Sequence, residues 1–184
     1  MQKPENDLPI IILENDPIIS IEEQIIIIEW TKKNHDRFTQ NGFNRKAKRL
    51  DLLPDFPEIA FAIKKRLEEK ENLMKYKEEP FFGNVIAFMT EGGQLHKHVD
   101  PNQDKNQLIH VRFNIYVQIP LKGGLPVYNN QIIKLEERNY VCCRSGLDEH
   151  YCLKVEGEKE RIVLSFGYLI PKTELNDINL KYKI

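Results

Sequence analysis

The sequence predicts a mainly β fold that begins with helices and continues as an antiparallel sandwich or jelly roll. Apolar residues recur at helical spacing in the first 79 residues, and short segments rich in β-branched and aromatic residues, separated by Gly, Pro, Asn and Asp, follow them. Helices followed by strands do not fit alternating βαβ units, which would build a parallel sheet. With 184 residues, 41% of them hydrophobic, the chain can bury one core. We therefore expect a single domain over residues 1–184, with helical support over about 1–79 and a jelly-roll core over about 80–171.

The first elements are expected to be a strand and a helix. A β-branched run at residues 8–13 predicts the strand. Ser20 and Glu23 have the spacing of a capping box, so a helix is expected from there to residue 33. Residues 34–55 are polar and read as irregular, with a turn at Asn41-Gly42.

A second helix is expected over residues 57–74, because Pro57 suits a first helical turn and apolar residues follow at helical spacing. The C-terminal residues 176–184 read as a short edge strand or a tail. The segments between these two regions that predict strands are 84–90, 109–119, 139–144, 151–155 and 161–170.

Composition excludes several classes of protein. Lys and Arg total 27 and Asp and Glu total 28, so no global positive charge attracts nucleic acid. The basic strip at residues 45–49 can contact phosphates, but such a strip is more often a solvated turn or helix face. No apolar run is long enough to span a membrane, and the three clustered cysteines do not form a disulfide framework. We expect a cytoplasmic protein without a membrane segment; the sequence carries no signal for its oligomeric state.

Two predicted strands have one polar face. Arg112, Asn114, Tyr116 and Gln118 alternate with apolar residues in one strand, and Arg161 and Ser165 share a face of the last strand. A polar face of this kind either meets water or lines a polar cavity inside a barrel. The arginine on each strand favours the cavity.

A metal site is predicted from His98, Asp100 and His150. His98 and Asp100 are two residues apart, so on an extended strand both side chains point to one side. Two histidines and one carboxylate on one face of a metal are typical of non-heme Fe(II) oxygenases, whose open positions accept O2 and a cosubstrate. The alternatives are an ordinary hydrogen-bonded pair, or His96 in place of His98; we prefer His98 because only it makes the HxD spacing.

Arg161 follows His150 by eleven residues and lies on the polar face of the last strand. A guanidinium in this position can pair with the distal carboxylate of a dicarboxylate whose other end binds the metal.

The passage His98-Val99-Asp100, then His150, then residues 161–167, resembles the 2-oxoglutarate- and Fe(II)-dependent dioxygenase superfamily, over about residues 80 to 171. The likeness is to its prolyl-hydroxylase-like or aspartyl/asparaginyl-hydroxylase-like branch. It implies a double-stranded β-helix (jelly roll, cupin-like) with an HxD...H iron site. Carried over, it implies that His98, Asp100 and His150 bind Fe(II) and that Arg161, assisted by Tyr116, holds the C5 carboxylate of 2-oxoglutarate. Ser165 lies two residues later than the serine of several subfamilies, where this chain has Val163.

The resemblance implies an enzyme, a dioxygenase that hydroxylates a C–H bond of an amino-acid side chain in a peptide or small molecule. Its cofactors and cosubstrates would be Fe(II), 2-oxoglutarate and O2, with succinate and CO2 released. Arg112, Asn114 and Arg144 are candidate substrate contacts, although Arg112 can instead touch the cosubstrate and Arg144 can belong to a solvated turn. The alternative function is a non-catalytic, cupin-like metal- or ligand-binding protein, which would not need Arg161.

Overall fold

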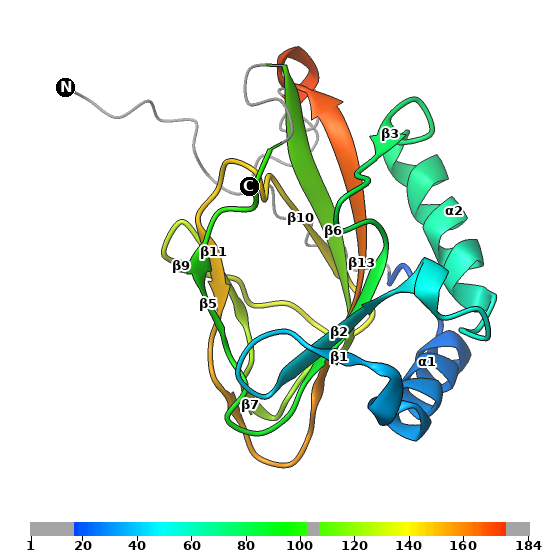
Figure 1. Ribbon diagram of the computed structural model, residues 1–184, viewed down its shortest axis with the longest axis vertical. Coiled ribbons are helices and arrows are strands. Elements are labelled where there is room, and N and C mark those ends of the chain that lie inside the picture. Colours follow the sequence, from blue (N-terminus) through cyan, green and yellow to red (C-terminus); the bar gives the residue numbers. More distant parts are fainter. Residues whose placement is uncertain (1–16, 103–106, 176–184) are drawn as a thin grey trace.

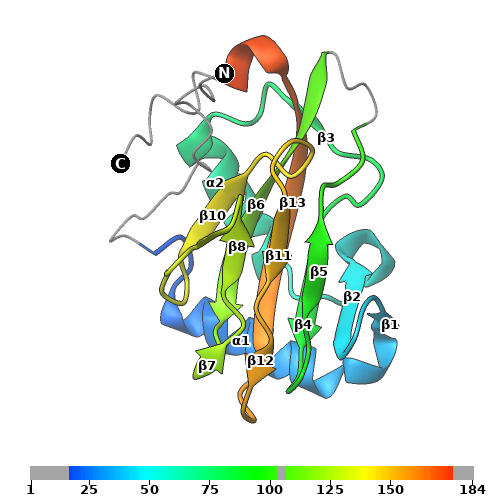
Figure 2. The ribbon, with the colours of Figure 1, turned by 90° about the vertical axis from the view of Figure 1, so that its left-hand side faces the viewer.

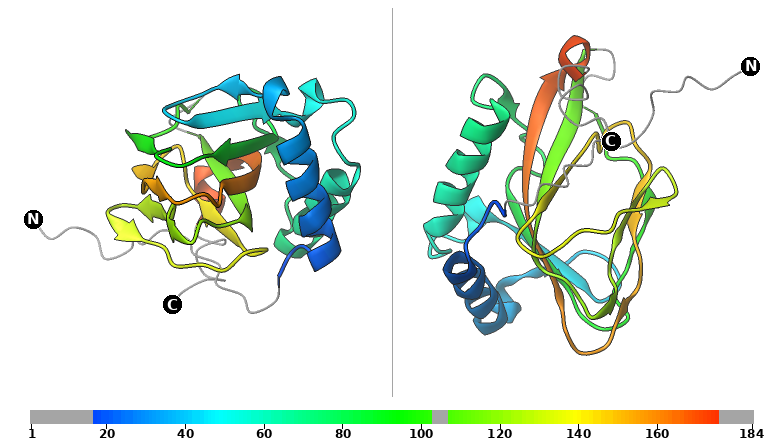
Figure 3. Two further views of the ribbon diagram at one scale, coloured as in Figure 1. Left: turned by 90° about the horizontal axis from the view of Figure 1, so that it is seen from below. Right: turned by 180° about the vertical axis from the view of Figure 1, so that it is seen from behind.

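In a computed structural model, which describes residues 17–102 and 107–175, two antiparallel sheets face each other and two helices cover the outer face of the larger sheet (Figure 1; Figure 3). The strand expected at residues 8–13 and the C-terminal segment at 176–184 lie outside the described residues. The predicted mainly β fold with N-terminal helices is confirmed.

The two helices are α1 (Ile21–Lys33) and α2 (Ile59–Glu71). At the start of α1 the Ser20 hydroxyl accepts a hydrogen bond from the Glu23 amide, and the Glu23 carboxylate accepts one from the Ser20 amide, so the predicted capping box is present. Helix α2 ends at Asn72, whose left-handed backbone (φ 55°) closes the last turn. Short 3₁₀ helices occur at His35–Arg37, Leu50–Leu52 and Lys172–Glu174.

The larger sheet has the strand order β1-β2-β4-β13-β6-β10, with β3 paired to β13. A four-stranded sheet with the order β5-β11-β8-β9 faces it, and β7 pairs with β12 (Figure 2). The strands of the larger sheet are β1 (Thr39–Gln40), β2 (Arg45–Arg49), β3 (Lys77–Glu78), β4 (Val85–Met89), β6 (Leu108–Gln118), β10 (Tyr140–Cys143) and β13 (Arg161–Pro171). The other strands are β5 (Leu95–His98), β7 (Lys122–Gly123), β8 (Pro126–Tyr128), β9 (Gln131–Ile132), β11 (His150–Cys152) and β12 (Val155–Glu156).

The segment 34–55 is not irregular, as the sequence suggested, but contributes β1 and β2 to the larger sheet. The predicted turn at Asn41-Gly42 lies between these strands, and Gly42 has φ 112°. The basic strip 45–49 is strand β2 and not a solvated turn or helix face; it pairs along its whole length with β4. Arg and Lys have low intrinsic strand preference, so the pairing with a buried neighbour decides this element.

The core lies between the outer face of the larger sheet and the helices. Alternate residues of β6 and β13 point to the helices and are buried, as are Ile27 of α1 and Ile63 and Leu67 of α2. The opposite residues of both strands face the smaller sheet, so the polar face predicted from the sequence is turned into the molecule. Within the described ranges, no helix has the length and apolar character needed to cross a lipid bilayer.

Candidate metal centre

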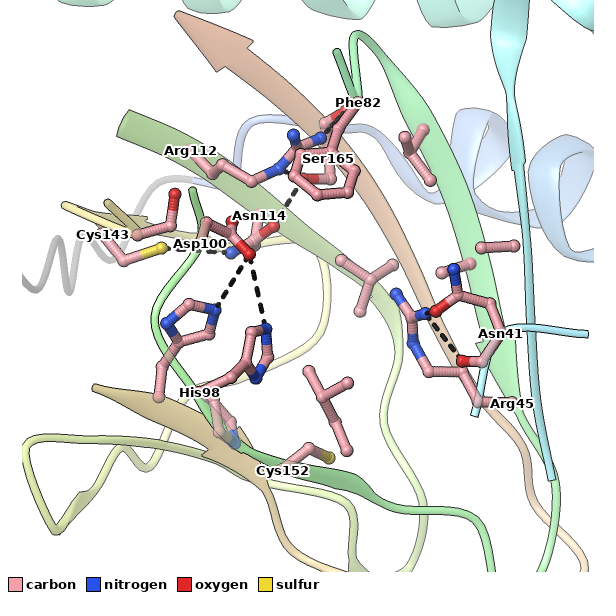
Figure 4. A pocket seen from close by; sticks show the side chains of 18 of the residues that line it. Asn41, Arg45, Phe82, His98, Asp100, Arg112, Asn114, Cys143, Cys152 and Ser165 are labelled. Atoms are coloured by element: carbon pink, nitrogen blue, oxygen red, sulfur yellow. Dashed lines mark hydrogen bonds and ion pairs between the residues drawn. The ribbon is translucent and has the colours of Figure 1, made fainter. Parts of the chain in front are cut away.

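A cavity of about 470 Å³ lies between the two sheets (Figure 4). Its lining includes inward residues of β2, β4, β6 and β13 on one side and of β5, β8 and β11 on the other. The sequence-predicted residues His98, Asp100, Arg112, Asn114 and Tyr116 line it, as do His150, Arg161 and Ser165.

His98, Asp100 and His150 come together at one side of this cavity, although His150 follows Asp100 by 50 residues in the sequence. His98 of β5 and His150 of β11 are register partners in adjacent antiparallel strands. Asp100 follows β5, and its amide donates a hydrogen bond to the carbonyl oxygen of Ser145 at 2.8 Å. One ligand atom from each of the three side chains lies within 4.8 Å of the others. The three residues that the sequence spacing predicted as a metal site therefore lie together in the structure.

The two imidazoles are held in the same tautomer. Nδ1 of His98 lies 2.7 Å from the carbonyl oxygen of His96, and Nδ1 of His150 lies 2.9 Å from that of Asp148. A carbonyl oxygen only accepts, so each Nδ1 carries the proton and each Nε2 of the neutral ring presents a lone pair. Both Nε2 atoms point to Oδ1 of Asp100, at 3.4 and 4.0 Å. Three electron-pair donors that converge in this way fit a divalent cation.

The charges of the trio differ. Burial opposes ionisation of Asp100. A hydrogen bond from Nε2 of His98 in its protonated form, together with the positive charges of Arg112 and the neighbouring histidines when protonated, outweighs this and lowers the pKa of Asp100 to about 2. The same hydrogen bond raises the pKa of His98, whereas burial lowers the pKa of His150. The site thus holds a permanent carboxylate and at least one neutral imidazole at neutral pH.

His96, the competing ligand candidate, is exposed on β5 and does not belong to the cluster. Only its backbone oxygen takes part, as the acceptor for His98. The preference for the HxD histidine agrees with this geometry.

Arg161 and Tyr116 form a second polar point in the cavity. Nη2 of Arg161 donates a hydrogen bond to the Tyr116 hydroxyl at 3.1 Å, and its guanidinium lies 5.0 Å from the centre of the tyrosine ring. Arg161 is 8% exposed and its Nε has no hydrogen-bond partner among the described residues. A buried N–H without a partner is costly, so the site suits an anion.

Ser165 lies at a different place from Arg161. Four residues along a strand correspond to about 13 Å between the two backbone positions, and the Ser165 hydroxyl has its hydrogen bonds with other residues than Arg161. Its hydroxyl accepts a hydrogen bond from Nε of Arg112 at 2.8 Å and donates one to Oδ1 of Asn114 at 2.6 Å (Figure 4). Arg112 also donates to the carbonyl oxygen of Gly83 at 2.9 Å. These contacts occupy Arg112, which the sequence suggested as a substrate or cosubstrate contact.

Arg144 is not in the cavity lining and does not lie in a solvated turn. It is buried and donates from Nε and Nη2 to the carboxylate of Asp148, at 2.9 and 2.7 Å. Asn129 also donates to Asp148, at 3.0 Å. This network holds the turn that precedes His150.

Three residues near the site were missed by the sequence. His110 is fully buried with Nδ1 3.6 Å from Asp100, and burial lowers its pKa to about 4. Glu79 accepts hydrogen bonds from the amides of residues 81–83 and lies 3.8 Å from His110. Arg45 reaches the cavity from β2. The strand alternation that marked Arg112 extends to His110 and could have found it, whereas nothing in the sequence pairs Arg45 with the cavity.

The cysteines are buried and unpaired. Cys143 and Cys152 line the cavity, whereas Cys142 belongs to the core under the helices. Burial raises the pKa of Cys143 to about 12, so this thiol stays protonated.

Comparison of the sequence with protein-family models and with curated protein sequences gives no match. Solved structures, in contrast, share the fold. Viral collagen prolyl hydroxylase from Paramecium bursaria Chlorella virus-1, in complex with 2OG, superposes with a TM-score of 0.60 and 18% identity, covering 84% of this chain and 92% of that one. HygX from Streptomyces hygroscopicus, with nickel and 2-oxoglutarate bound, gives 0.61 and 11%, over 91% and 87%.

A prolyl-4-hydroxylase from Pseudomonas putida gives a TM-score of 0.57 and 11% identity, over 84% of this chain and 89% of that one. At such identities the likeness concerns the fold. The chain therefore has the fold of the prolyl hydroxylases and of HygX, and the resemblance to the 2-oxoglutarate- and Fe(II)-dependent dioxygenase superfamily that its sequence indicated is confirmed at the level of the fold.

Proposed function

We propose that this protein is an Fe(II)- and 2-oxoglutarate-dependent dioxygenase that hydroxylates a C–H bond of a small substrate. The observation that carries the proposal is the convergence of two imidazole Nε2 atoms and one carboxylate oxygen within 4.8 Å. The same cavity holds the Nε of Arg161, which has no hydrogen-bond partner among the residues that the structure describes. We also propose that the two facing sheets form a double-stranded β-helix. The similarity of this fold to a prolyl hydroxylase and to HygX supports the proposal.

In the proposed site His98, Asp100 and His150 would hold the metal at the wall of the cavity. When bound, Fe(II) supplies the activation of O2, with 2-oxoglutarate oxidised to succinate and CO2 as one oxygen atom enters succinate and the other the substrate C–H bond. Arg161 binds the C5 carboxylate of 2-oxoglutarate, and Tyr116 fixes the orientation of its guanidinium.

The remaining residues shape this cavity. Ser165, Asn114 and Arg112 form a buried hydrogen-bonded row that keeps the Arg112 side of the cavity polar and rigid. Met89, Cys152, Val155 and Leu95 form an apolar cluster, part of which lines the cavity, that limits water near the substrate C–H bond. Asn114 remains a candidate substrate contact because its amide lies in the lining.

Two of the similar structures are prolyl hydroxylases, and a third is HygX with hygromycin B bound. They favour a peptide or a small molecule as the substrate of this chain. The non-catalytic cupin-like alternative does not explain why the buried Nε of Arg161 has no hydrogen-bond partner among the described residues, so we prefer the enzyme.

The test is metal and cosubstrate binding by the full chain. We expect wild-type protein to bind redox-inert Mn(II) and, once loaded, 2-oxoglutarate, and to form succinate slowly when Fe(II) and O2 are supplied. His98→Ala should abolish metal binding, whereas His96→Ala, two residues away on the same strand, should bind Mn(II) as the wild type does. Failure of wild-type protein to bind Mn(II), or equal binding by His98→Ala, would contradict the proposed site.

A further inference from the structure

A second guanidinium lies in the cavity on the same row of side chains as Arg161. In the sheet, Met89 of β4 is the register partner of Arg161 on one side and of Arg45 on the other. Register partners in adjacent strands point to the same face, so both arginines face the cavity with Met89 between them. The strands β2 and β13 are two spacings apart, about 10 Å, so the two side chains start from separate positions.

Arg45 has no acidic partner in the part of the chain that the structure describes. Its Nη1 donates to the backbone oxygen of Asn41 at 3.0 Å and to the Asn41 side-chain oxygen. Its Nε is shielded from solvent and has no hydrogen-bond partner among those residues. No described residue therefore pairs with the Nε–Nη2 edge of the guanidinium, which is the edge that takes a carboxylate side-on.

The charges of the proposed site leave Arg45 uncompensated. Fe(II) and Arg161 are balanced by Asp100 and the two carboxylates of 2-oxoglutarate, and Arg112 has Glu79 4.0 Å away. Burial, together with repulsion from Arg161 and Arg112, lowers the pKa of Arg45 to about 10, which still leaves it charged at neutral pH. Lys48, also in the lining, adds positive charge on the same strand. A half-buried cation that has no acidic partner among the described residues is stabilised by an anionic ligand.

The space beside Arg45 is suited to a small molecule. The next row of the sheet carries Ala47, Ala87 and Val163, whose short side chains leave room above them. Figure 4 shows Arg45 and Asn41 on the side of the cavity opposite His98 and Asp100. A compound anchored at Arg45 can therefore extend across the cavity to the metal centre. A volume of about 470 Å³ fits the cosubstrate and a compound of modest size.

We propose that Arg45 binds a free carboxylate of the substrate, so that the enzyme acts on a small carboxylic acid such as a free amino acid and not on an internal residue of a peptide. This inference rests on the proposed function. Arg45 is then a specificity-determining residue for the substrate, distinct from Arg161, which serves the cosubstrate. Asn41 holds the guanidinium from the other side and leaves the Nε–Nη2 edge to the ligand.

The experiment uses full-length protein saturated with Mn(II) and 2-oxoglutarate. The loaded protein is titrated with the free proteinogenic amino acids and with short aliphatic carboxylic acids. The carboxamide of each acid and peptides blocked at both ends are titrated in the same way. Binding is followed by the shift in melting temperature and by calorimetry. We expect at least one acid to bind and its carboxamide to bind about tenfold more weakly or worse, because the amide loses a charge-assisted contact.

Arg45→Gln should lose this discrimination between acid and amide and still bind Mn(II) and 2-oxoglutarate. Lys46→Gln removes one positive charge from the neighbouring position of β2, which is outside the cavity lining, and should discriminate as the wild type does. Arg161→Gln should lose 2-oxoglutarate binding. This pattern separates the two subsites.

Four results would overturn the inference. They are binding of no acid in the panel, equal binding of acid and amide, preference for the blocked peptides, and loss of 2-oxoglutarate affinity in Arg45→Gln, which would assign Arg45 to the cosubstrate. If wild-type protein binds neither Mn(II) nor 2-oxoglutarate, the proposed function itself fails. If it binds both but shows no preference for carboxylates, only the role of Arg45 fails.

Discussion

Arg161 donates a hydrogen bond from Nη2 to the hydroxyl of Tyr116 at 3.1 Å, between two adjacent strands of the larger sheet. Both side chains are buried on the cavity face, so the tyrosine fixes the direction of the guanidinium without neutralising it. A fixed, charged guanidinium is what a bidentate contact with a carboxylate needs.

This pair predicts two graded losses of 2-oxoglutarate affinity. Tyr116→Phe removes one neutral acceptor and should weaken binding to the Mn(II)-loaded protein by about threefold to tenfold, whereas Arg161→Gln removes a charged contact and should weaken it by about a hundredfold. Calorimetry measures both dissociation constants. Tyr76→Phe is the control, because its hydroxyl bonds to Glu174 away from the cavity. A larger loss in Tyr116→Phe than in Arg161→Gln would argue against this division of roles.

The buried ion pair of Arg144 and Asp148 predicts an indirect effect on the metal. Asp148 accepts the hydrogen bond of His150 through its backbone oxygen, and its side chain is held by Arg144. Asp148→Asn should therefore lower Mn(II) affinity by about tenfold, as is common for groups that orient a metal ligand. Thermal unfolding of the metal-free variant reports the separate loss of stability.

The control for Asp148 is its neighbour. Glu149→Gln removes a carboxylate that pairs with Lys97 at the surface, and it should leave Mn(II) affinity unchanged. Asp148→Asn with wild-type affinity for Mn(II) would mean that the ion pair supports only the fold.

The elements that the sequence predicted well are those whose pattern is local. The capping box at Ser20 and the two-residue alternation in β6 and β13 depend on neighbours in the chain, and both are present. The HxD spacing likewise predicted that His98 and Asp100 lie close together, and their side chains are 3.4 Å apart although Asp100 follows the end of β5.

The parts that escaped prediction depend on contacts between distant segments. Strand β2 exists because β4 pairs with it, and its basic sequence alone reads as solvent-exposed. Ser165 and Arg161 share a face, but only the register with β6 shows that Ser165 meets Asn114 and Arg112 and that Arg161 meets Tyr116. Likewise Arg144 pairs with Asp148 four residues later, whereas the sequence around Arg144 was equally consistent with a solvated turn.

The ion pair of Glu23 with Arg66 predicts a pH-dependent stability away from the cavity. The hydrogen bonds from Arg66, at 2.8 and 2.9 Å, lower the pKa of Glu23 from its ordinary value of 4.5. A carboxyl with a lower pKa in the folded chain stabilises the fold above its unfolded pKa, and this contribution is lost as the pH falls through the folded value.

The free energy of unfolding should therefore be higher in wild-type protein than in Glu23→Gln at neutral pH, and the difference should shrink below about pH 4.5. Urea unfolding at a series of pH values measures it. Glu29→Gln, on the exposed side of the same helix, should show a smaller difference throughout. A constant difference for Glu23→Gln between pH 7 and pH 3 would exclude ionisation as its cause.

Gly146 predicts a coupling between the two segments that carry the metal trio. The Asn102 amide donates to the carbonyl oxygen of Gly146 at 2.7 Å and accepts from the His110 amide at 3.0 Å, so it joins the segment after Asp100 to the turn before His150. A Cβ on residue 146 would collide with the Asn102 amide. The glycine is needed for this close approach and not for an unusual backbone angle.

Gly146→Ala should therefore displace the Asn102 side chain, which then loses both of its hydrogen bonds. We expect the free energy of unfolding to fall by about 1–3 kcal/mol. Asn102→Ala loses the same bonds by another route. Because each single change removes the same interaction, Asn102→Ala with Gly146→Ala should be no less stable than Asn102→Ala alone. Urea unfolding of the four proteins measures the coupling. Fully additive losses would mean that Gly146 serves the turn itself and that the two metal-bearing segments are not joined through Asn102.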